Sequence, residues 1–221
     1  ILARVDAAMK ALCAQHADIV VLPELVGERW IEANLAKWME NAPAAGARPP
    51  ALILAGTRLE KDDEDRTRNR AHVLSGYGAI AWVQDKLHAY NFEVSHQEAA
   101  GFPLGSGDVR DRSEAITIEP RKLVIADLSA SQRVVVCTCE DFADEEPHAG
   151  TIRACKATLL LVPVMAAGRA SETTSWLHGR AMSYVQQPGA ASIVANSGAL
   201  VREHPESAAS YAQVIATPRV F

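Results

Sequence analysis

Residues 133–141 read RVVVCTCED, and this stretch decides how the rest of the sequence is interpreted. A short apolar run of β-branched residues is typical of a buried strand. The run ends at Cys139, which two acidic residues follow at once. A strand that ends in a nucleophile and turns sharply presents the sulfur at the sheet edge, where backbone N–H groups just beyond it can bind a developing oxyanion. The stretch therefore makes Cys139 a candidate nucleophile.

The cysteines also allow other interpretations. Cys137 and Cys139 lie two apart on the predicted strand, so both side chains point to one face. His148 and Cys155 would complete a four-ligand metal set, but the spacing matches no common zinc pattern. A redox pair would normally have two intervening residues. The ordinary alternative is that the cysteines are buried as small apolar side chains.

Two further strand ends, working outward, carry charged residues. Residues 18–24 read DIVVLPE, so Glu24 follows a continuous apolar run through Pro23. Desolvation at the edge of the core raises the pKa of a carboxylate toward that of a working base. Lys86 ends the predicted strand before His88, where it could supply a fixed positive charge beside a reacting carbonyl. Taken alone, each could equally be a solvated surface group.

The composition is that of a globular protein. The 221 residues are 48% hydrophobic and 22% charged, which excludes a chain too polar to fold and allows one large domain or two small ones. A formal net charge of -5 argues against a nucleic-acid partner. No apolar run reaches the ~18 residues of a membrane span. We expect a reducing cytoplasm, because the four cysteines form no spaced disulfide framework.

Hydrophobic periodicity predicts alternating strands and helices at both ends of the chain, with a strand meander between them. Helices are expected over residues 1–16, 28–40, 148–156 and 172–187. Strands are expected over residues 19–22, 51–55, 70–75, 79–84, 114–118, 123–127, 133–139, 158–162 and 190–195, with a further candidate within 208–216. Residues 88–109 are the least regular stretch. This order favours an α/β fold whose sheets pair strands both parallel and antiparallel.

Together the three segments resemble the nitrilase, or carbon–nitrogen hydrolase, superfamily, whose hallmark is a Glu–Lys–Cys triad at three strand ends in that order. Residues 18–25, 86–88 and 136–141 look like its glutamate, lysine and cysteine motifs. Cys139 rather than Cys137 fits the motif, because the family's cysteine is followed by an aromatic or acidic residue and then an acidic one. The Cys-Glu-Asp form is similar to the glutaminase domains of glutamine-dependent NAD synthetases. Family-like stretches also include residues 69–76, 157–163 and 180–196.

The resemblance implies a hydrolase of non-peptide C–N bonds, acting on an amide, or on a nitrile or carbamoyl compound. Glu24 would take the thiol proton of Cys139, whose thiolate attacks the substrate carbon. Lys86 and a backbone N–H after Cys139 would stabilise the tetrahedral intermediate. Ammonia or an amine would leave, and water activated by the same glutamate would cleave the thioester. This chemistry needs no metal and no organic cofactor.

Members of the family often carry a second active-site glutamate shortly after the lysine. Glu93 is the first candidate for that position and Glu98 the second, and Glu93 and Glu140 are the candidate substrate-binding residues. Ala89 stands where many members have leucine, and residues 164–165 replace a polar or aromatic pair. Because these positions shape the pocket, the departures leave the substrate open.

The implied fold is a four-layer α-β-β-α sandwich with mixed sheets, which the family pairs into dimers or larger homo-oligomers through helix faces. We expect residues 1–221 to form a single carbon–nitrogen hydrolase domain that lacks the family's first strand and part of its C-terminal end. The expected partners are a small-molecule amide or nitrile and a second copy of the chain, with no nucleic acid and no membrane. Two alternatives stay open: an N-acyltransferase that uses the same triad, and a catalytically inactive nitrilase-like interaction module.

Overall fold

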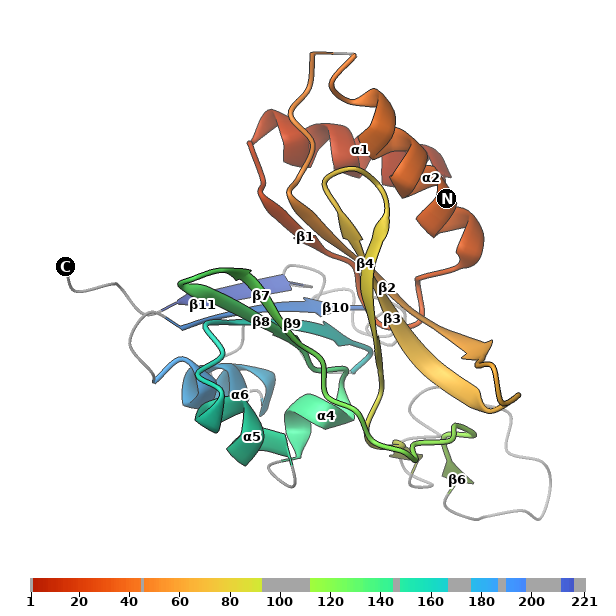
Figure 1. Cartoon of the computed structure of the whole chain (residues 1–221), viewed down its shortest axis with the longest axis vertical. Helices are drawn as coiled ribbons and strands as arrows, with labels where there is room; N and C mark the ends of the chain where they lie inside the picture. The colour runs from red at the N-terminus through yellow and green to blue at the C-terminus, as the bar shows by residue number, and fades with distance from the viewer. Residues whose placement is uncertain are drawn as a thin grey trace, which may run out of the picture.

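The computed structural model describes residues 2–44, 46–92, 112–144, 148–166, 176–186, 190–197 and 212–216. Two main β-sheets and two groups of helices contain most of these residues (Figure 1). Each of the two main sheets combines parallel and antiparallel strand pairs. The expected α/β fold with mixed sheets is therefore confirmed.

The first sheet has the strand order β1-β2-β3-β4. β1 pairs in parallel with β2, and β2, β3 and β4 form an antiparallel meander. β2 continues past Ala55, where the sequence predicts its end, because residues 58–61 pair with residues 67–70 of β3 in a long two-stranded arm. The strand bounds are β1 (Ile19–Val21), β2 (Leu52–Lys61), β3 (Thr67–Ser75) and β4 (Ile80–Asp85).

The second sheet has the strand order β11-β10-β9-β8-β7. Its three central strands are parallel, and both edge strands pair antiparallel. A separate two-stranded pair, β5 (Asn91–Phe92) with β6 (Arg112–Ser113), lies outside both main sheets. The strands of the second sheet are β7 (Ile125–Ser129), β8 (Gln132–Val136), β9 (Leu159–Val164), β10 (Ala191–Asn196) and β11 (Ala212–Ala216).

Each main sheet has helices packed on one face (Figure 1). α1 (Leu2–Ala14) and α2 (Arg29–Asn41) pack on the first sheet. The buried residues of α2 are Ile31, Leu35 and Met39, which recur every four residues and so form one apolar face. α4 (Glu140–Ala143), α5 (His148–Ala154) and α6 (Trp176–Tyr184) pack on the second sheet.

A third apolar cluster joins the two sheets and contains residues from β2, β3, β8 and β9. Val134 and Val136 of β8 lie in this cluster, whereas Val135 and Cys137 lie in the cluster beneath α4, α5 and α6. Successive side chains of a strand point to opposite faces, so β8 is buried on both sides. Double burial is the physical reason why residues 134–137 read as an uninterrupted apolar run.

Two further local features differ from the sequence predictions. Residues 114–118 form no strand, because Glu114 is turned away into a polar cluster and the Ile116 N–H bonds back to the Glu114 carbonyl. α4 is a helix of four residues, too short to show a hydrophobic period in the sequence.

Within the described parts of the chain, no helix combines the length and apolar character needed to cross a membrane.

Candidate active site

Three buried side chains with complementary chemistry meet just beyond the ends of three strands. Glu24 follows β1, Lys86 follows β4 directly, and Cys139 follows β8. Their exposed fractions are 3%, 3% and 6%, respectively. The strands belong to two different sheets, so the site lies where the two sheets pack together.

The loop that carries Glu24 is fixed to an irregular point in β2. The Leu25 N–H donates to Thr57 Oγ1 over 3.0 Å, and the Gly27 N–H donates to the Thr57 carbonyl over 2.9 Å. The strand register shifts between Leu54 and Thr57, and Gly56 has a φ of 78° there. A Cβ at Gly56 would lie 2.6 Å from the Pro23 carbonyl oxygen, so a residue without a side chain is required for this close approach.

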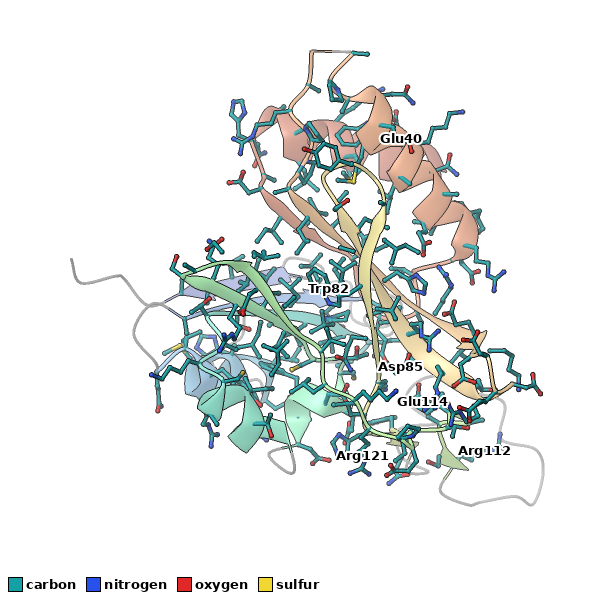
Figure 2. The ribbon with its side chains drawn as sticks, viewed as in Figure 1. Glu40, Trp82, Asp85, Arg112, Glu114 and Arg121 are labelled. Atoms are coloured by element: carbon teal, nitrogen blue, oxygen red, sulfur yellow. The ribbon has the colours of Figure 1, made fainter. Side chains whose placement is uncertain are left out.

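Lys86 lies between two carboxylates. Its Nζ is 2.9 Å from Glu24 Oε1 and 2.7 Å from Glu114 Oε2. Asn69 connects the same two carboxylates, because its Nδ2 donates to Glu24 Oε1 over 3.0 Å and to Glu114 Oε1 over 2.8 Å. Figure 2 labels Glu114 near the end of β4, where Asp85 precedes Lys86. One ammonium group and one amide thus hold two acidic side chains in place.

Cys139 has a backbone conformation that is unusual for a residue with a side chain. Its φ is 47° and its ψ is -100°, and it is the N-cap residue of α4. The Cys139 N–H donates to the Pro163 carbonyl over 3.0 Å, which continues the pairing of β8 with β9. Left-handed backbone at a bulky residue is costly and persists where the surroundings enforce it. The turn places the sulfur against Glu24, with which the thiol forms a hydrogen bond.

The Met165 backbone N–H connects the glutamate to the cysteine. It donates to Glu24 Oε2 over 3.1 Å and also to the Cys139 sulfur. Ala166, which follows Met165, is held by Asn196 at the end of β10. Asn196 Oδ1 accepts from the Ala166 N–H over 2.9 Å, and Asn196 Nδ2 donates to the Ala166 carbonyl over 3.0 Å. The segment after β9 is thereby fixed beside the thiol.

Burial and neighbouring charges shift the pKa values of all three groups. Burial raises the pKa of Glu24, and Lys86 opposes this shift. Burial and then the Glu24 charge raise the pKa of the Cys139 thiol well above its ordinary value, whereas Lys86 and the Met165 N–H lower it. Burial alone would lower the pKa of Lys86, but Glu24, Cys139 and Glu114 raise it well above its usual range. Lys86 is therefore a permanent cation, and the thiol needs a local base to ionise.

Cys137 lies in a different environment from Cys139. It is fully buried, and burial, followed by the nearby charges of Asp141 and Cys155, raises the pKa of its thiol. Among the residues that the structure describes, no group of three or more His, Cys, Asp or Glu side chains is arranged to hold a metal ion. The apolar cluster around β8 contains Cys137 and packs against Cys155.

The structure brings Glu24, Lys86 and Cys139 together and places Glu140 next to them. Glu140 is partly buried, and its pKa is raised by burial and by Asp144, while Lys86 and His88 lower it. Glu93 and Glu98 lie outside the described residues.

Sequence reasoning missed Glu114 and Asn69 as members of the site. Glu114 has no spacing signature, since 28 residues separate it from Lys86. Asn69 has a weak local signal: it shares a strand face with Ala71 and Val73, both buried in the cluster between the sheets. A polar residue on such a face needs a polar partner.

Comparisons with known proteins give a consistent result for the fold. No protein-family profile and no curated protein matches the chain. Among solved structures, a cysteine-to-alanine mutant of the Nesterenkonia AN1 amidase from the nitrilase superfamily aligns with a TM-score of 0.57 at 16% identity, over 88% of this chain and 69% of that one. Glutamine-dependent NAD+ synthetase from Acinetobacter baumannii aligns with a TM-score of 0.55 at 16% identity, over 89% of this chain and 34% of that one.

A further structure of the Nesterenkonia sp. AN1 amidase, a glutamate-to-glutamine mutant, shows covalent addition of the acetamide moiety of fluoroacetamide at the active-site cysteine. It aligns with a TM-score of 0.55 at 17% identity, over 88% of this chain and 68% of that one. The resemblance of the sequence to the nitrilase superfamily is thereby confirmed at the level of the fold.

Proposed function

We propose that this chain is a cysteine hydrolase of non-peptide C–N bonds and that its substrate is a small-molecule amide. The observation that carries the proposal is the mutual burial of a carboxylate, an ammonium group and a thiol at Glu24, Lys86 and Cys139. If Glu24 and Lys86 formed only a structural ion pair, the site would need no thiol hydrogen-bonded to the carboxylate. It would also need no left-handed backbone at that cysteine. The fold shared with nitrilase-superfamily amidases supports the same reaction class.

In the first step Glu24 accepts the thiol proton of Cys139. The hydrogen bond between the two groups already defines the path of the proton. The Lys86 charge and the Met165 N–H stabilise the thiolate that forms. Burial raises the pKa of Glu24, which makes its carboxylate a stronger base than a free carboxylate.

In the second step the thiolate attacks the amide carbon and the carbonyl oxygen becomes an oxyanion. Lys86 Nζ and the N–H of Glu140 stabilise that charge, because the first N–H groups of a helix have no partner within the helix. The C–N bond then breaks, and the leaving nitrogen takes the proton held by Glu24. Water, deprotonated by the same carboxylate, cleaves the thioester and restores the thiol. No metal or organic cofactor takes part.

Glu114 and Asn69 hold the side chains of Lys86 and Glu24 in place during these reaction steps. Two carboxylates beside one ammonium group hold the Nζ at a fixed point between them. Asn69 donates to both carboxylates and so prevents them from turning away. We propose that Glu114 serves in this site as a second carboxylate partner of Lys86.

Replacing Glu24 by glutamine is expected to lower kcat/KM for amide hydrolysis by about 10²–10⁴-fold, because glutamine keeps the shape but accepts no proton. In the parent, kcat/KM should fall as the pH drops through the pKa of Glu24, which lies above the ordinary 4.5. That acidic limb should be absent from the variant. Ammonia release over a pH series measures both effects, with the exposed Glu28→Gln as the control. Equal profiles for Glu24→Gln and the control would exclude Glu24 as the base.

Glu140 is proposed to contact the substrate, because it directly follows the nucleophile and is partly buried near Lys86. Glu140→Gln is expected to raise KM about tenfold and to leave kcat within about threefold, as loss of one charge-assisted hydrogen bond would do. The exposed Glu28→Gln is the matched control. A KM that stays unchanged in Glu140→Gln would remove this residue from the substrate contacts.

We also propose the four-layer α-β-β-α sandwich as the architecture of a single domain over residues 1–221. Support comes from the three apolar clusters, one between the sheets and one beneath each group of helices. α6 exposes Trp176 and Met182, which supports pairing of two copies through this helix. Sedimentation analysis tests the pairing: a Trp176→Glu variant should be monomeric where the parent is a dimer, and a parent that is itself monomeric would contradict it.

A further inference from the structure

Asp141 is a fully buried carboxylate two residues after Cys139, and it is not one of the three reacting groups. Its exposed fraction is 1%. Its Oδ1 accepts hydrogen bonds from the Leu87 N–H over 2.9 Å and from the His88 N–H over 2.8 Å. The His88 Nδ1 lies 3.3 Å from the same oxygen. Its Oδ2 accepts from the Thr138 N–H over 3.3 Å.

These contacts join the segment that follows Lys86 to the segment that carries Cys139. Leu87 directly follows Lys86, and Thr138 directly precedes Cys139. β4 and β8 belong to different sheets, so no strand ladder sets the distance between the lysine and the cysteine. The Asp141 carboxylate is a direct hydrogen-bonded connection between the two segments. Capping of α4 would account for the Thr138 contact but not for the two bonds to Leu87 and His88.

We propose that Asp141 is a positioning residue that holds the segment after Lys86 against the turn carrying Cys139, and so sets the approach of the ammonium group to the sulfur. The inference rests on the proposed function, because the distance matters only if the sulfur reacts. The hydrogen bonds described above link Asp141 to the backbone and to His88 rather than to the three side chains of the proposed mechanism. Its effect passes through the backbone of Leu87 and His88, and therefore through the placement of Lys86.

Two substitutions separate this role from a purely electrostatic one. Asp141→Asn removes the charge but keeps Oδ1 as an acceptor for the Leu87 and His88 N–H groups. Asp141→Ala removes the charge and both acceptors. If charge alone mattered, both variants would increase the reactivity of Cys139, because a nearby negative charge disfavours a thiolate. If position matters, the alanine variant loses reactivity and the asparagine variant keeps it.

The test is the rate of alkylation of Cys139 by iodoacetamide, with tandem mass spectrometry assigning the modification to Cys139 or Cys137. Relative to the parent, we expect Asp141→Ala to react at least about tenfold more slowly and Asp141→Asn to stay within about threefold. Asp141→Ser, too short to reach Leu87, serves if the alanine variant does not fold. Asp62→Asn is the control for loss of a hydrogen-bonded carboxylate elsewhere, because Asp62 bonds Arg66 and Arg68.

An alanine variant within about threefold of the parent or faster, or asparagine and alanine variants that are equally slow, would overturn the inference. Kinetics on an amide give a second readout: kcat should fall about tenfold in Asp141→Ala, with KM within about threefold. Alkylation of Cys139 does not require amide turnover. The role of Asp141 can therefore be tested independently of the proposed function. A parent that alkylates rapidly at Cys139 but releases no ammonia contradicts the proposed function, and the alkylation rates still test Asp141.

Discussion

Cys139→Ala is expected to lower ammonia release from an amide by at least about 10³-fold, because the residue supplies the atom that attacks the amide carbon in the proposed mechanism. The thiol is hydrogen-bonded to Glu24 and lies in the electric field of Lys86. Alanine retains the burial of the site but leaves nothing to attack the carbonyl carbon. The measurement is ammonia released per chain over time from a panel of amides and nitriles.

Cys137→Ala is the matched control for this substitution. Cys137 lies two residues earlier, just after β8, and it is buried in the same apolar cluster as Cys139. The titratable groups that shift its pKa are Asp141 and Cys155 rather than Glu24 and Lys86. The control should therefore lose packing energy but retain ammonia release within about threefold. Equal activity in Cys139→Ala and the parent, or loss of activity in Cys137→Ala alone, would refute the assignment of the nucleophile.

Lys86→Met is expected to remove activity and also to destabilise the fold strongly. Methionine fills a similar volume but leaves the buried carboxylate of Glu24 and the partly buried carboxylate of Glu114 without this cation. Breaking a buried ion pair by removing one partner typically costs about 3–5 kcal/mol, because the remaining charge is left uncompensated. Loss of the positive charge beside the oxyanion should lower kcat/KM by about 10²–10³-fold. Urea unfolding followed by fluorescence measures the change in stability.

The pH dependence of that destabilisation tests its cause. Without Lys86, burial raises the pKa of Glu24 with no opposing cation. A carboxyl group whose pKa is higher in the folded than in the unfolded state costs stability as the pH rises above its unfolded value. The stability deficit of Lys86→Met should therefore be larger near about pH 8 than near about pH 4.

A second substitution should relieve part of this deficit. The double variant Lys86→Met with Glu114→Gln carries one fewer buried charge and should regain part of the lost stability at neutral pH. A Lys86→Met variant as stable as the parent at pH 8 would contradict the pairing of these groups.

The mixed α/β fold and the strand ends that carry Glu24, Lys86 and Cys139 could be predicted from the sequence, because each depends on a local pattern. Glu24 and Cys139 each follow a doubly buried strand, which appears as a continuous apolar run with a polar residue at its end. Lys86 follows a strand that a turn at residues 76–78 makes recognisable. In each case the end of the strand places the side chain where the two sheets pack together.

Tertiary contacts account for what the sequence could not predict. Glu114 reaches Lys86 across 28 residues of chain, and no spacing rule governs such a connection. Residues 58–61 lie beyond the strand predicted over 51–55, but they pair with β3 and are held by ion pairs such as Arg58 with Glu32 of α2. The left-handed backbone of Cys139 has no sequence signal, since glycine would be the expected residue there.

The most direct test of the central claim is mass spectrometry of the chain. The chain is mixed with an excess of an amide that it hydrolyses and is quenched in acid at successive times. The proposed mechanism predicts an acyl group on the peptide spanning residues 134–153, located at Cys139, which disappears once the substrate is consumed. Release of ammonia while Cys139 stays unmodified at every time point would contradict the thioester mechanism and with it the role of this residue.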